Sequence, residues 1–382
     1  MSRASSIALG NIMATKSGSV DPSKFTDEIF DLYSIPAFDR GEPEIVAGSA
    51  IGSAKQVVEP GDVLLSKIVP HIRRSWIVGK ERGRRIIASG EWIVFRSECA
   101  NPDYLRQVLV GDPFHTQFMN TVAGVGGSLL RARPAHVAKI AIPLPPLAEQ
   151  RRIAAVLDRA EALRAKRRAA LAQLDSLTQS LFLDLFGNPV GNPNKWRMCA
   201  VGEIADCIVP GRDKPKSFTG NVPWITTDDL QHLEVTSSSP KKLGLSAAEI
   251  AEVRARVIPE GSVIISCVGD LGIVSLAGTD LVINQQLHSF QCHENVNNVF
   301  MMHCLAFQEA FMYAKASSTT LPYMNKTVCN SIPVVVPPIP LQREFARRVT
   351  AVEALKTAQR ASLAELDALF ATLQHRAFRG EL

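Results

Sequence analysis

Residues 144–153, Leu-Pro-Pro-Leu-Ala-Glu-Gln-Arg-Arg-Ile, recur in related form at 336–345 as Val-Pro-Pro-Ile-Pro-Leu-Gln-Arg-Glu-Phe. The offset is 192 residues, and 17 of 43 positions are identical when 144–186 is aligned without a gap on 336–378. Two periods of 192 residues account for almost all of the 382-residue chain. The sequence therefore predicts a protein that contains two copies of one plan.

Each copy of the repeat predicts a long helix. A Pro-Pro pair sets an extended start, and no proline or glycine follows from 147 to 186 or from 341 to 378. Apolar residues recur three and four positions apart, as at Ile153, Leu157 and Ala160. At about 1.5 Å per residue, each helix would reach roughly 55–60 Å, which is too long for one small core. We expect the two helices to pack as an antiparallel coiled coil, with ordinary core helices as the alternative.

The apolar seam of each predicted helix becomes polar near its middle, at Arg164 in the first helix and Lys356 in the second. Antiparallel packing would bring these two centres together. Glu161 and Glu353 lie one turn away, where each can offset the neighbouring positive charge. We favour a solvated gap at this place over a docking site for a partner protein.

A block of about 145 residues precedes each predicted helix. Short apolar runs at 62–65, 91–95 and 262–265 predict strands, whereas 104–119 and 247–256 predict short helices. The expected fold is α+β, with two mixed domains, two long helices and an internal pseudo-two-fold repeat. The expected boundaries are 1–143 for the first domain, 144–189 for a central spacer helix, 190–335 for the second domain and 336–382 for a C-terminal spacer helix.

The composition excludes several classes of protein. Apolar residues make up 46% of the chain and the net charge is only +5, which excludes a disordered chain or a polybasic tail. Seven cysteines are scattered without a CxxC pair, so we expect reduced thiols and neither a zinc cage nor a disulfide framework. No apolar run approaches the roughly 18–20 residues of a membrane span. We therefore expect a soluble cytoplasmic protein with no membrane partner.

Positive charge is concentrated in one part of the first block. Six cations lie within thirteen positions, opposed only by Glu81, and Trp76 lies among them. Such a focus is typical of a surface that binds the phosphates of nucleic acid; the alternative is the solvated face of a hairpin. The candidate DNA-binding residues are Arg73, Arg74, Lys80, Arg82, Arg84 and Arg85.

The second block carries a weaker signal, because it has 11 basic and 13 acidic residues. Binding there would depend on local loops and on polar contacts with bases, not on a broad field. Its basic candidates can equally be ordinary surface residues, and Gln285 and Gln286 can equally be base contacts or amides of a turn or core. The candidate DNA-binding residues are Arg212, Lys214, Lys216, Thr226, Thr227, Lys241 and Lys242.

Catalytic motifs are missing from the sequence. It contains no GxxxxGK[ST] phosphate loop, no HExxH metal motif and no Gly-x-Ser-x-Gly elbow. Asn101-Pro102-Asp103-Tyr104 approaches the Asn/Asp-Pro-Pro-aromatic motif of adenine methyltransferases, but an acid replaces the second proline. We interpret it as a helix N-cap. We therefore predict no catalytic, metal-binding or cofactor-binding residues, and expect the chain alone not to be an enzyme.

Taken together, these features resemble the DNA specificity subunits of type I restriction–modification systems. The run at 144–153 is the most specific signature, and 61–64, 222–225 and 284–286 are further family-like segments. The second copy departs at Leu341, where the family usually places a glutamate. This departure weakens any contact assigned to the carboxylate of Glu149 but leaves the helix intact.

The resemblance implies that the two blocks are target recognition domains, each reading one half of a bipartite, asymmetric site in double-stranded DNA. The helices would be spacers that hold the readers apart by more than one DNA turn of about 34 Å. The implied partners are two methylation subunits, which bind S-adenosylmethionine and modify adenine N6, and optional restriction subunits that use ATP with magnesium. The alternative is a coiled-coil adaptor whose two blocks bind proteins.

Overall fold

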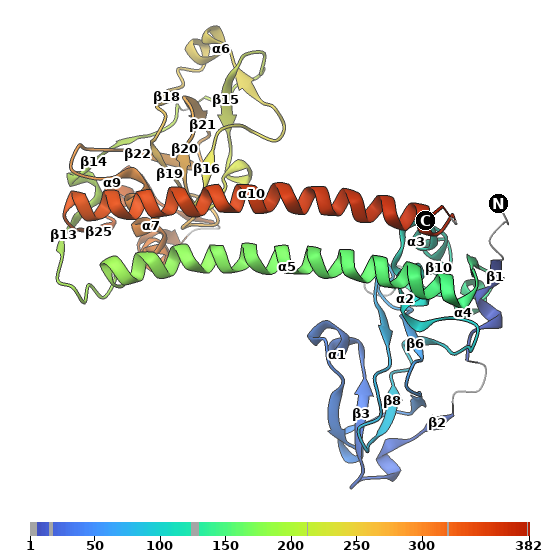
Figure 1. Ribbon diagram of the computed structural model, residues 1–382. Coiled ribbons are helices and arrows are strands. Elements are labelled where there is room, and N and C mark those ends of the chain that lie inside the picture. The colour runs from blue at the N-terminus through green and yellow to red at the C-terminus, as the bar shows by residue number, and fades with distance from the viewer. Residues whose placement is uncertain (1–5, 15–17, 124–129, 212, 319–320, 380) are drawn as a thin grey trace. The chain divides into compact units, whose positions relative to one another are not determined.

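The computed structural model describes residues 6–14, 18–123, 130–211, 213–318, 321–379 and 381–382. The fold is α+β, and the chain divides into two compact units. Unit 1 comprises Met1–Arg168 and Arg360–Leu382, and unit 2 comprises Ala169–Gln359. The two long helices are α5 (Leu147–Phe186) and α10 (Ile339–Ala377), drawn in green and red in Figure 1. Each unit therefore contains one globular block and one part of each long helix.

In unit 1, the first half of α5 packs against the last half of α10. Ile153 and Leu157 are buried in the same apolar cluster as Ala377. The Arg164 guanidinium lies 4.3 Å from the centre of the Phe370 ring, where it gains a cation–π contact. Since the early part of α5 meets the late part of α10, the two segments are antiparallel within this unit.

In unit 2, the pairing is again antiparallel, but the contact is aromatic. Phe182 and Phe186 near the end of α5 lie 5.4 and 5.5 Å from Phe345 near the start of α10, measured between ring centres. Phe300 from the globular block lies 4.8 Å from Phe186. Such edge-on aromatic contacts add to the free energy gained from apolar burial. They bind both helices to the core of unit 2.

The globular part of unit 1 contains a three-stranded antiparallel sheet and a five-stranded mixed sheet. In the smaller sheet, β6 (Val63–Ser66) lies between β7 (Ser75–Ile77) and β9 (Trp92–Phe95). The larger sheet has the order β2-β5-β8-β3-β4, and its β3 and β8 are parallel. The remaining strands are β1 (Ser6–Ala8), β2 (Ser19–Val20), β3 (Ile29–Tyr33), β4 (Glu44–Ala47), β5 (Lys55–Val57), β8 (Arg85–Ala88), β10 (Val122–Ala123), β11 (Arg131–Ala132) and β12 (Ala141–Pro143). The helices are α1 (Ile35–Arg40), α2 (Pro102–Val110), α3 (Asp112–Met119) and α4 (Pro134–Val137).

The globular part of unit 2 contains a five-stranded and a four-stranded sheet. Their orders are β14-β22-β19-β20-β16 and β17-β15-β21-β18, and β15 is parallel to β21. The strands are β13 (Arg197–Ala200), β14 (Ala205–Ile208), β15 (Val222–Ile225), β16 (Val235–Thr236), β17 (Gly244–Leu245), β18 (Val257–Ile258), β19 (Val263–Ser266), β20 (Val274–Ala277), β21 (Leu281–Ile283), β22 (Leu287–Cys292), β23 (Ser317–Ser318), β24 (Pro322–Tyr323) and β25 (Pro333–Val336). The helices are α6 (Ala247–Glu252), α7 (Asn298–Ala306), α8 (Glu309–Lys315) and α9 (Lys326–Asn330).

The elements predicted from sequence are present, but some boundaries differ. The helix expected over 104–119 is divided at Gly111 into α2 and α3. The helix α10 spans Ile339–Ala377 within the segment expected over 336–382, and Pro340 lies in its first turn, where its missing N–H is tolerated. Asn101 is an N-cap as expected, since its side chain accepts a hydrogen bond from the N–H of Tyr104.

The seven cysteines are all free thiols. Four of them, Cys207, Cys267, Cys304 and Cys329, are buried. Among the described residues, no cluster of histidine, cysteine or carboxylate side chains could hold a metal ion. In the same part of the chain, no helix has the length and apolar character that crossing a membrane requires.

Candidate nucleic-acid interface

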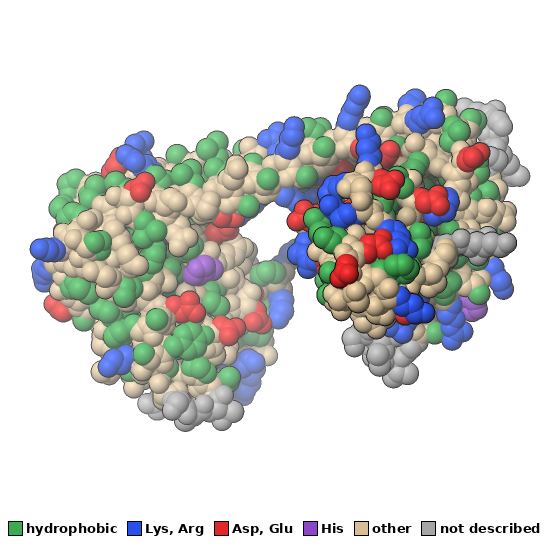
Figure 2. All heavy atoms as spheres, turned by 90° about the horizontal axis from the view of Figure 1, so that it is seen from below, with side chains coloured by type: hydrophobic (Ala, Val, Ile, Leu, Met, Phe, Trp, Pro, Cys, Tyr) green, Lys and Arg blue, Asp and Glu red, His purple; other side chains and the backbone are tan. Residues whose placement is uncertain are grey.

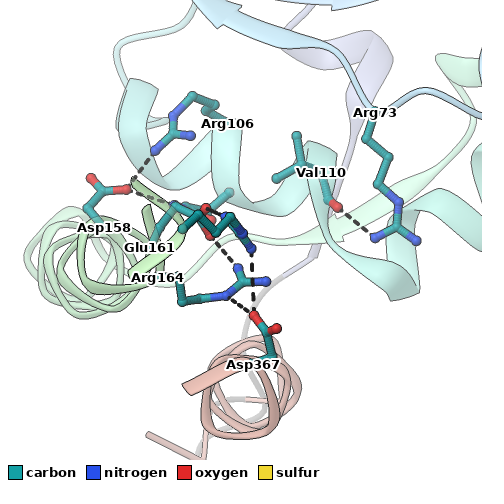
Figure 3. A network of polar contacts seen from close by, with 9 residues as sticks. Arg73, Arg106, Val110, Asp158, Glu161, Arg164 and Asp367 are labelled. Carbon is teal, nitrogen blue, oxygen red and sulfur yellow. Dashed lines mark hydrogen bonds and ion pairs between the residues drawn. The ribbon is translucent and has the colours of Figure 1, made fainter. Parts of the chain in front are cut away.

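The basic cluster predicted at 73–85 lies between β6 and the start of β8, and it begins with two arginines that have acidic partners. Arg73 donates to the carbonyl of Val110 at 3.1 Å and pairs with Asp112 at 2.6 Å. Figure 3 shows its guanidinium directed at that carbonyl. Arg74 is almost buried and makes a two-pronged contact with Asp39, at 2.8 and 3.0 Å. This contact holds the pKa of Asp39 below its usual value.

The last two arginines of the cluster are also neutralised. Arg84 pairs at 2.7 Å with Asp31, whose carboxylate is buried. Arg85 pairs with Glu28, and this hydrogen-bonded pair raises the pKa of the Arg85 guanidinium. The Arg85 guanidinium also lies 4.5 Å from the centre of the Phe25 ring. Both arginines therefore contribute to the folded structure of unit 1.

Lys80 and Arg82 are the members of the cluster that remain open. Both are exposed, and among the described residues neither has an ion-pair partner. Trp76 lies 4.4 and 6.4 Å from Tyr33 and Trp92, measured between ring centres, so it is half-buried and packs against the core. On the face seen in Figure 2, lysine and arginine side chains lie interspersed with aspartate and glutamate. Of the six cations that the sequence predicts as one positive surface, Lys80 and Arg82 are therefore the two without an acidic partner among the described residues.

The four basic candidates of the second block that the structure describes are exposed. Lys214 and Lys216 follow Gly211, and Lys241 and Lys242 form a turn in which Lys242 has a positive φ of 54°. Arg212 lies outside the described residues. Open lysines of this kind can reach a phosphate without first breaking an ion pair.

The polar candidates of unit 2 have defined structural roles. The hydroxyl of Thr226 donates to Asp229 at 2.7 Å and thereby caps a short turn, whereas the hydroxyl of Thr227 is buried without a described partner. The side-chain amide of Gln285 donates to the carbonyls of Gly211 and Asp213 at 3.1 and 3.3 Å. Gln285 therefore positions the loop that carries Lys214.

A second group of charged residues in unit 1 does not stand out in the sequence, because its members are far apart along the chain. Lys67, Glu91, Arg131 and Arg133 line a cavity of about 410 Å³. Arg131 pairs with one oxygen of Glu91 at 2.9 Å, and the other oxygen of Glu91 is buried without a described partner. Backbone hydrogen bonds hold these segments together, so the grouping of the four charged residues is visible only in the folded chain.

The centre of the long helices also contains ion pairs. In unit 1, Arg164 contacts Glu161 and lies 2.5 Å from Asp367. Both contacts are drawn as dashed lines in Figure 3. In unit 2, the buried ammonium of Lys356 lies 2.7 Å from Asp175 and 2.8 Å from Glu353. The hydrogen bonds to these carboxylates raise the pKa of Lys356, against the opposing effect of burial. The polar middle expected at Arg164 and Lys356 is therefore paired within each unit.

Comparison with known proteins identifies the family. Residues 193–367 match the family model of the type I restriction modification DNA specificity domain. Residues 193–367 therefore contain a domain of the type I restriction–modification specificity family. This finding confirms the resemblance noted in the sequence.

Curated relatives match part of the chain. The type I restriction enzyme MjaIX specificity subunit of Methanocaldococcus jannaschii is 21% identical over 159 residues. That match covers 40% of this chain and 37% of the relative, so this chain spans little more than a third of that protein.

Two solved structures share the fold over nearly the whole chain. One comes from work on the assembly and conformational transition of the type I restriction–modification system. It is 24% identical with a TM-score of 0.62, and the match covers 99% of this chain and 98% of that one. The other is a type I S subunit from M. genitalium, 11% identical with a TM-score of 0.60, covering 98% of this chain and 96% of that one.

Proposed function

We propose that this chain is the DNA-reading specificity subunit of a type I restriction–modification complex. Residues 1–143 and 190–335 each read one half of a bipartite site in double-stranded DNA, and the helices at 144–189 and 336–382 set the spacing. Two methylation subunits dock on this scaffold in the cytoplasm. The proposal rests on the match of residues 193–367 to the family model, together with the repeated internal contacts of the two units.

The repeated contacts are the observation that carries the proposal. In each unit, a first strand pairs antiparallel with the strand that precedes the long helix: β1 with β12, and β13 with β25. The ion pair of Arg164 with Asp367 has a counterpart in that of Lys356 with Asp175, since both partners are displaced by 192 positions. A pseudo-two-fold scaffold of this kind suits two readers of two half-sites.

The long helices support the proposed role as spacers. They contain 40 and 39 residues, and at about 1.5 Å per residue each is roughly 60 Å long. One turn of DNA is about 34 Å, so an antiparallel coiled coil of this length can separate two half-sites on one face of the duplex. Ion pairs at the centre and apolar contacts toward the ends would fix the register of the coil.

Under this proposal, the chemistry belongs to the partners. The methylation subunits bind S-adenosylmethionine, and restriction subunits, where present, use ATP with magnesium. Methylation of adenine in a duplex requires the base to be flipped out of the stack. This chain holds the flanking duplex while the base is extruded and is not itself an enzyme.

Sequence-dependent binding tests the proposal. The full chain, assembled with its methylation subunits, is titrated with a duplex that carries both half-sites and with duplexes in which one or both halves are scrambled. We expect a loss of about tenfold or more when either half is scrambled, because each mismatched base pair costs about 1–3 kcal/mol. Assembly with the methylation subunits but equal affinity for all duplexes would instead favour the coiled-coil adaptor.

A further inference from the structure

The cavity in unit 1 is built on a fixed backbone frame. The N–H of Lys67 donates to the carbonyl of Glu91 at 3.0 Å, and the carbonyl of Lys67 accepts from the N–H of Ala132 at 2.8 Å. One residue further along, the N–H of Val69 donates to the carbonyl of Leu130 at 3.2 Å. These bonds join the segment after β6, the turn before β9 and the strand β11. The side chains on the frame are therefore held in defined positions.

Unit 2 contains the same frame. The N–H of Cys267 donates to the carbonyl of Gln286 at 2.8 Å, and the carbonyl of Cys267 accepts from the N–H of Met324 at 2.9 Å. The N–H of Gly269 donates to the carbonyl of Pro322 at 3.0 Å. The segments joined are those after β19, before β22 and at β24, which occupy the same places in the order of elements.

The frame therefore matches residues between the two units, and the matched side chains differ in charge and in hydrogen-bonding capacity. Isolated bridges from Ile68 to Arg131 and from Val268 to Tyr323 extend the match. A constant backbone with different side chains is the arrangement expected of two readers with different targets. The matched pairs are Lys67 with Cys267, Glu91 with Gln286, Arg131 with Tyr323, and Arg133 with Asn325.

We propose that this frame is the base-reading surface of each recognition domain, an inference that rests on the proposed function. Its ligand is the edge of a base pair in duplex DNA together with the adjoining phosphates. In unit 1, Glu91 and Arg131 read the base pair, and Lys67 and Arg133 contact the backbone of the DNA. In unit 2, Gln286 takes the place of Glu91.

The chemistry of the side chains supports this assignment. One carboxylate oxygen of Glu91 accepts a hydrogen bond from Arg131, while the other oxygen is buried without a described partner. A buried acceptor without a donor lowers the stability of the fold, so a donor from a ligand would be bound favourably there. The exocyclic amino groups of cytosine and adenine are donors in the major groove, and carboxylates accept from cytosine in this way. The side chain of Arg131 is 61% exposed and retains N–H groups for guanine O6 and N7. A glutamine such as Gln286 has the donor and acceptor that adenine requires.

The phosphate contacts follow from the remaining charges. Arg133 is exposed and Lys67 is half-buried, and no acidic partner lies within ion-pair distance of either one among the described residues. This contrasts with Arg73, Arg74, Arg84 and Arg85, whose carboxylate partners would have to be displaced before a phosphate could bind. Lys67 and Arg133 would supply affinity for the DNA backbone, and the neighbouring Glu91 and Arg131 would supply selectivity for the base pair.

The test uses the full chain with its methylation subunits and a panel of duplexes in which each base pair of the recognised site is changed in turn. We expect Glu91→Gln to relax the preference at one base pair of one half-site by about tenfold, and Gln286→Ala to do the same in the other half only. Arg133→Ala should weaken binding to all duplexes alike and reduce the salt slope by about one. Arg40→Ala, which removes an exposed ion pair with Glu44 elsewhere in unit 1, is the matched control and should change none of these.

The outcomes separate this inference from the proposed function. Unchanged preference at every base pair in both Glu91→Gln and Gln286→Ala would overturn the inference, while the unmodified chain would still select a bipartite site. Absence of any sequence preference in the unmodified complex would defeat the proposed function itself. If Glu91→Gln lowers the unfolding midpoint, the variant Arg131→Lys is tested in its place. Lysine retains the positive charge of Arg131 but cannot make the planar, two-pronged contact with guanine. Full preference in Arg131→Lys would then overturn the inference.

Discussion

Gln150 and Gln342 make the same contacts in the two halves of the protein. The side-chain carbonyl of Gln150 accepts from the N–H of Asn101 at 2.7 Å, and that of Gln342 accepts from the N–H of Asn297 at 2.9 Å. Each amide also donates at 2.7 Å to a proline carbonyl five residues earlier. A buried glutamine therefore joins the start of each long helix to the N-cap of a helix in the globular block.

Loss of either glutamine should destabilise the unit that contains it. Gln150→Ala and Gln342→Ala each leave a partly or fully buried backbone N–H and carbonyl without this partner, which costs about 1–3 kcal/mol. We expect a lower midpoint of urea unfolding for both variants. Gln173→Ala, at an exposed position of α5, is the control and should lie within about 0.5 kcal/mol of the parent. Equal midpoints for Gln150→Ala and Gln173→Ala would contradict the structural role.

Low pH should destabilise unit 2 through two buried histidines. Burial, reinforced by the nearby His232 and Lys356, lowers the pKa of His303 to about 4, and burial with nearby Lys326 lowers that of His288 to about 4. The unfolded chain therefore binds more protons than the folded one between about pH 6.5 and 4. Stability should be fully present above about pH 6.5 and decline as the pH falls toward 4, by about 3 kcal/mol for each histidine.

The substitution His303→Gln tests whether His303 causes the loss of stability at low pH. Glutamine is chosen because it occupies the corresponding position in unit 1. Gln107 holds the corresponding place, six residues after the N-cap Asn101, as His303 is six residues after Asn297. We expect His303→Gln to remove about half of the acid-dependent loss of stability in urea unfolding at a series of pH values. The exposed His375 provides a control, because His375→Gln should leave the pH profile unchanged. A profile identical in His303→Gln and the parent would exclude His303 as the source.

The sequence predicts the helical scaffold better than the binding surface. Proline positions and apolar spacing are local properties, so α5 and α10 could be placed within a few residues. Arg74 is neutralised by Asp39, which lies 35 positions away in the sequence, and Arg84 by Asp31, which lies 53 positions away. Such pairs form only when strands and loops come together, so a count of charges along the sequence overestimates the positive focus at 73–85.

Substitutions in the basic cluster should separate binding from stability. Lys80→Ala combined with Arg82→Ala removes two exposed cations, so the salt slope of DNA binding should fall by about two with an unchanged unfolding midpoint. Arg74→Ala removes an almost buried side chain and its contact with Asp39, which should cost about 1–2 kcal/mol of stability. An unchanged salt slope in the double variant, measured with the methylation subunits bound, would remove Lys80 and Arg82 from the interface.

Thiol labelling should report the burial of the cysteines. Cys99 is exposed, whereas burial raises the pKa of Cys267 and Cys304 to about 12. Because the thiolate is the reactive form, buried thiols of raised pKa should react only after unfolding. We expect a fast phase with an aromatic disulfide reagent that disappears in Cys99→Ser. Fast labelling of Cys304 in the native chain would contradict the packing of α7.

The exchange of residues 190–335 for the corresponding block of another specificity protein tests the central claim most directly. The hybrid chain is assembled with its methylation subunits, and the methylated adenines are mapped on a DNA library. Two independent readers on one scaffold predict that one half of the methylated site changes while the other half and the spacing between them remain. A change in both halves, or in the spacing alone, would contradict the division into two readers and two spacers.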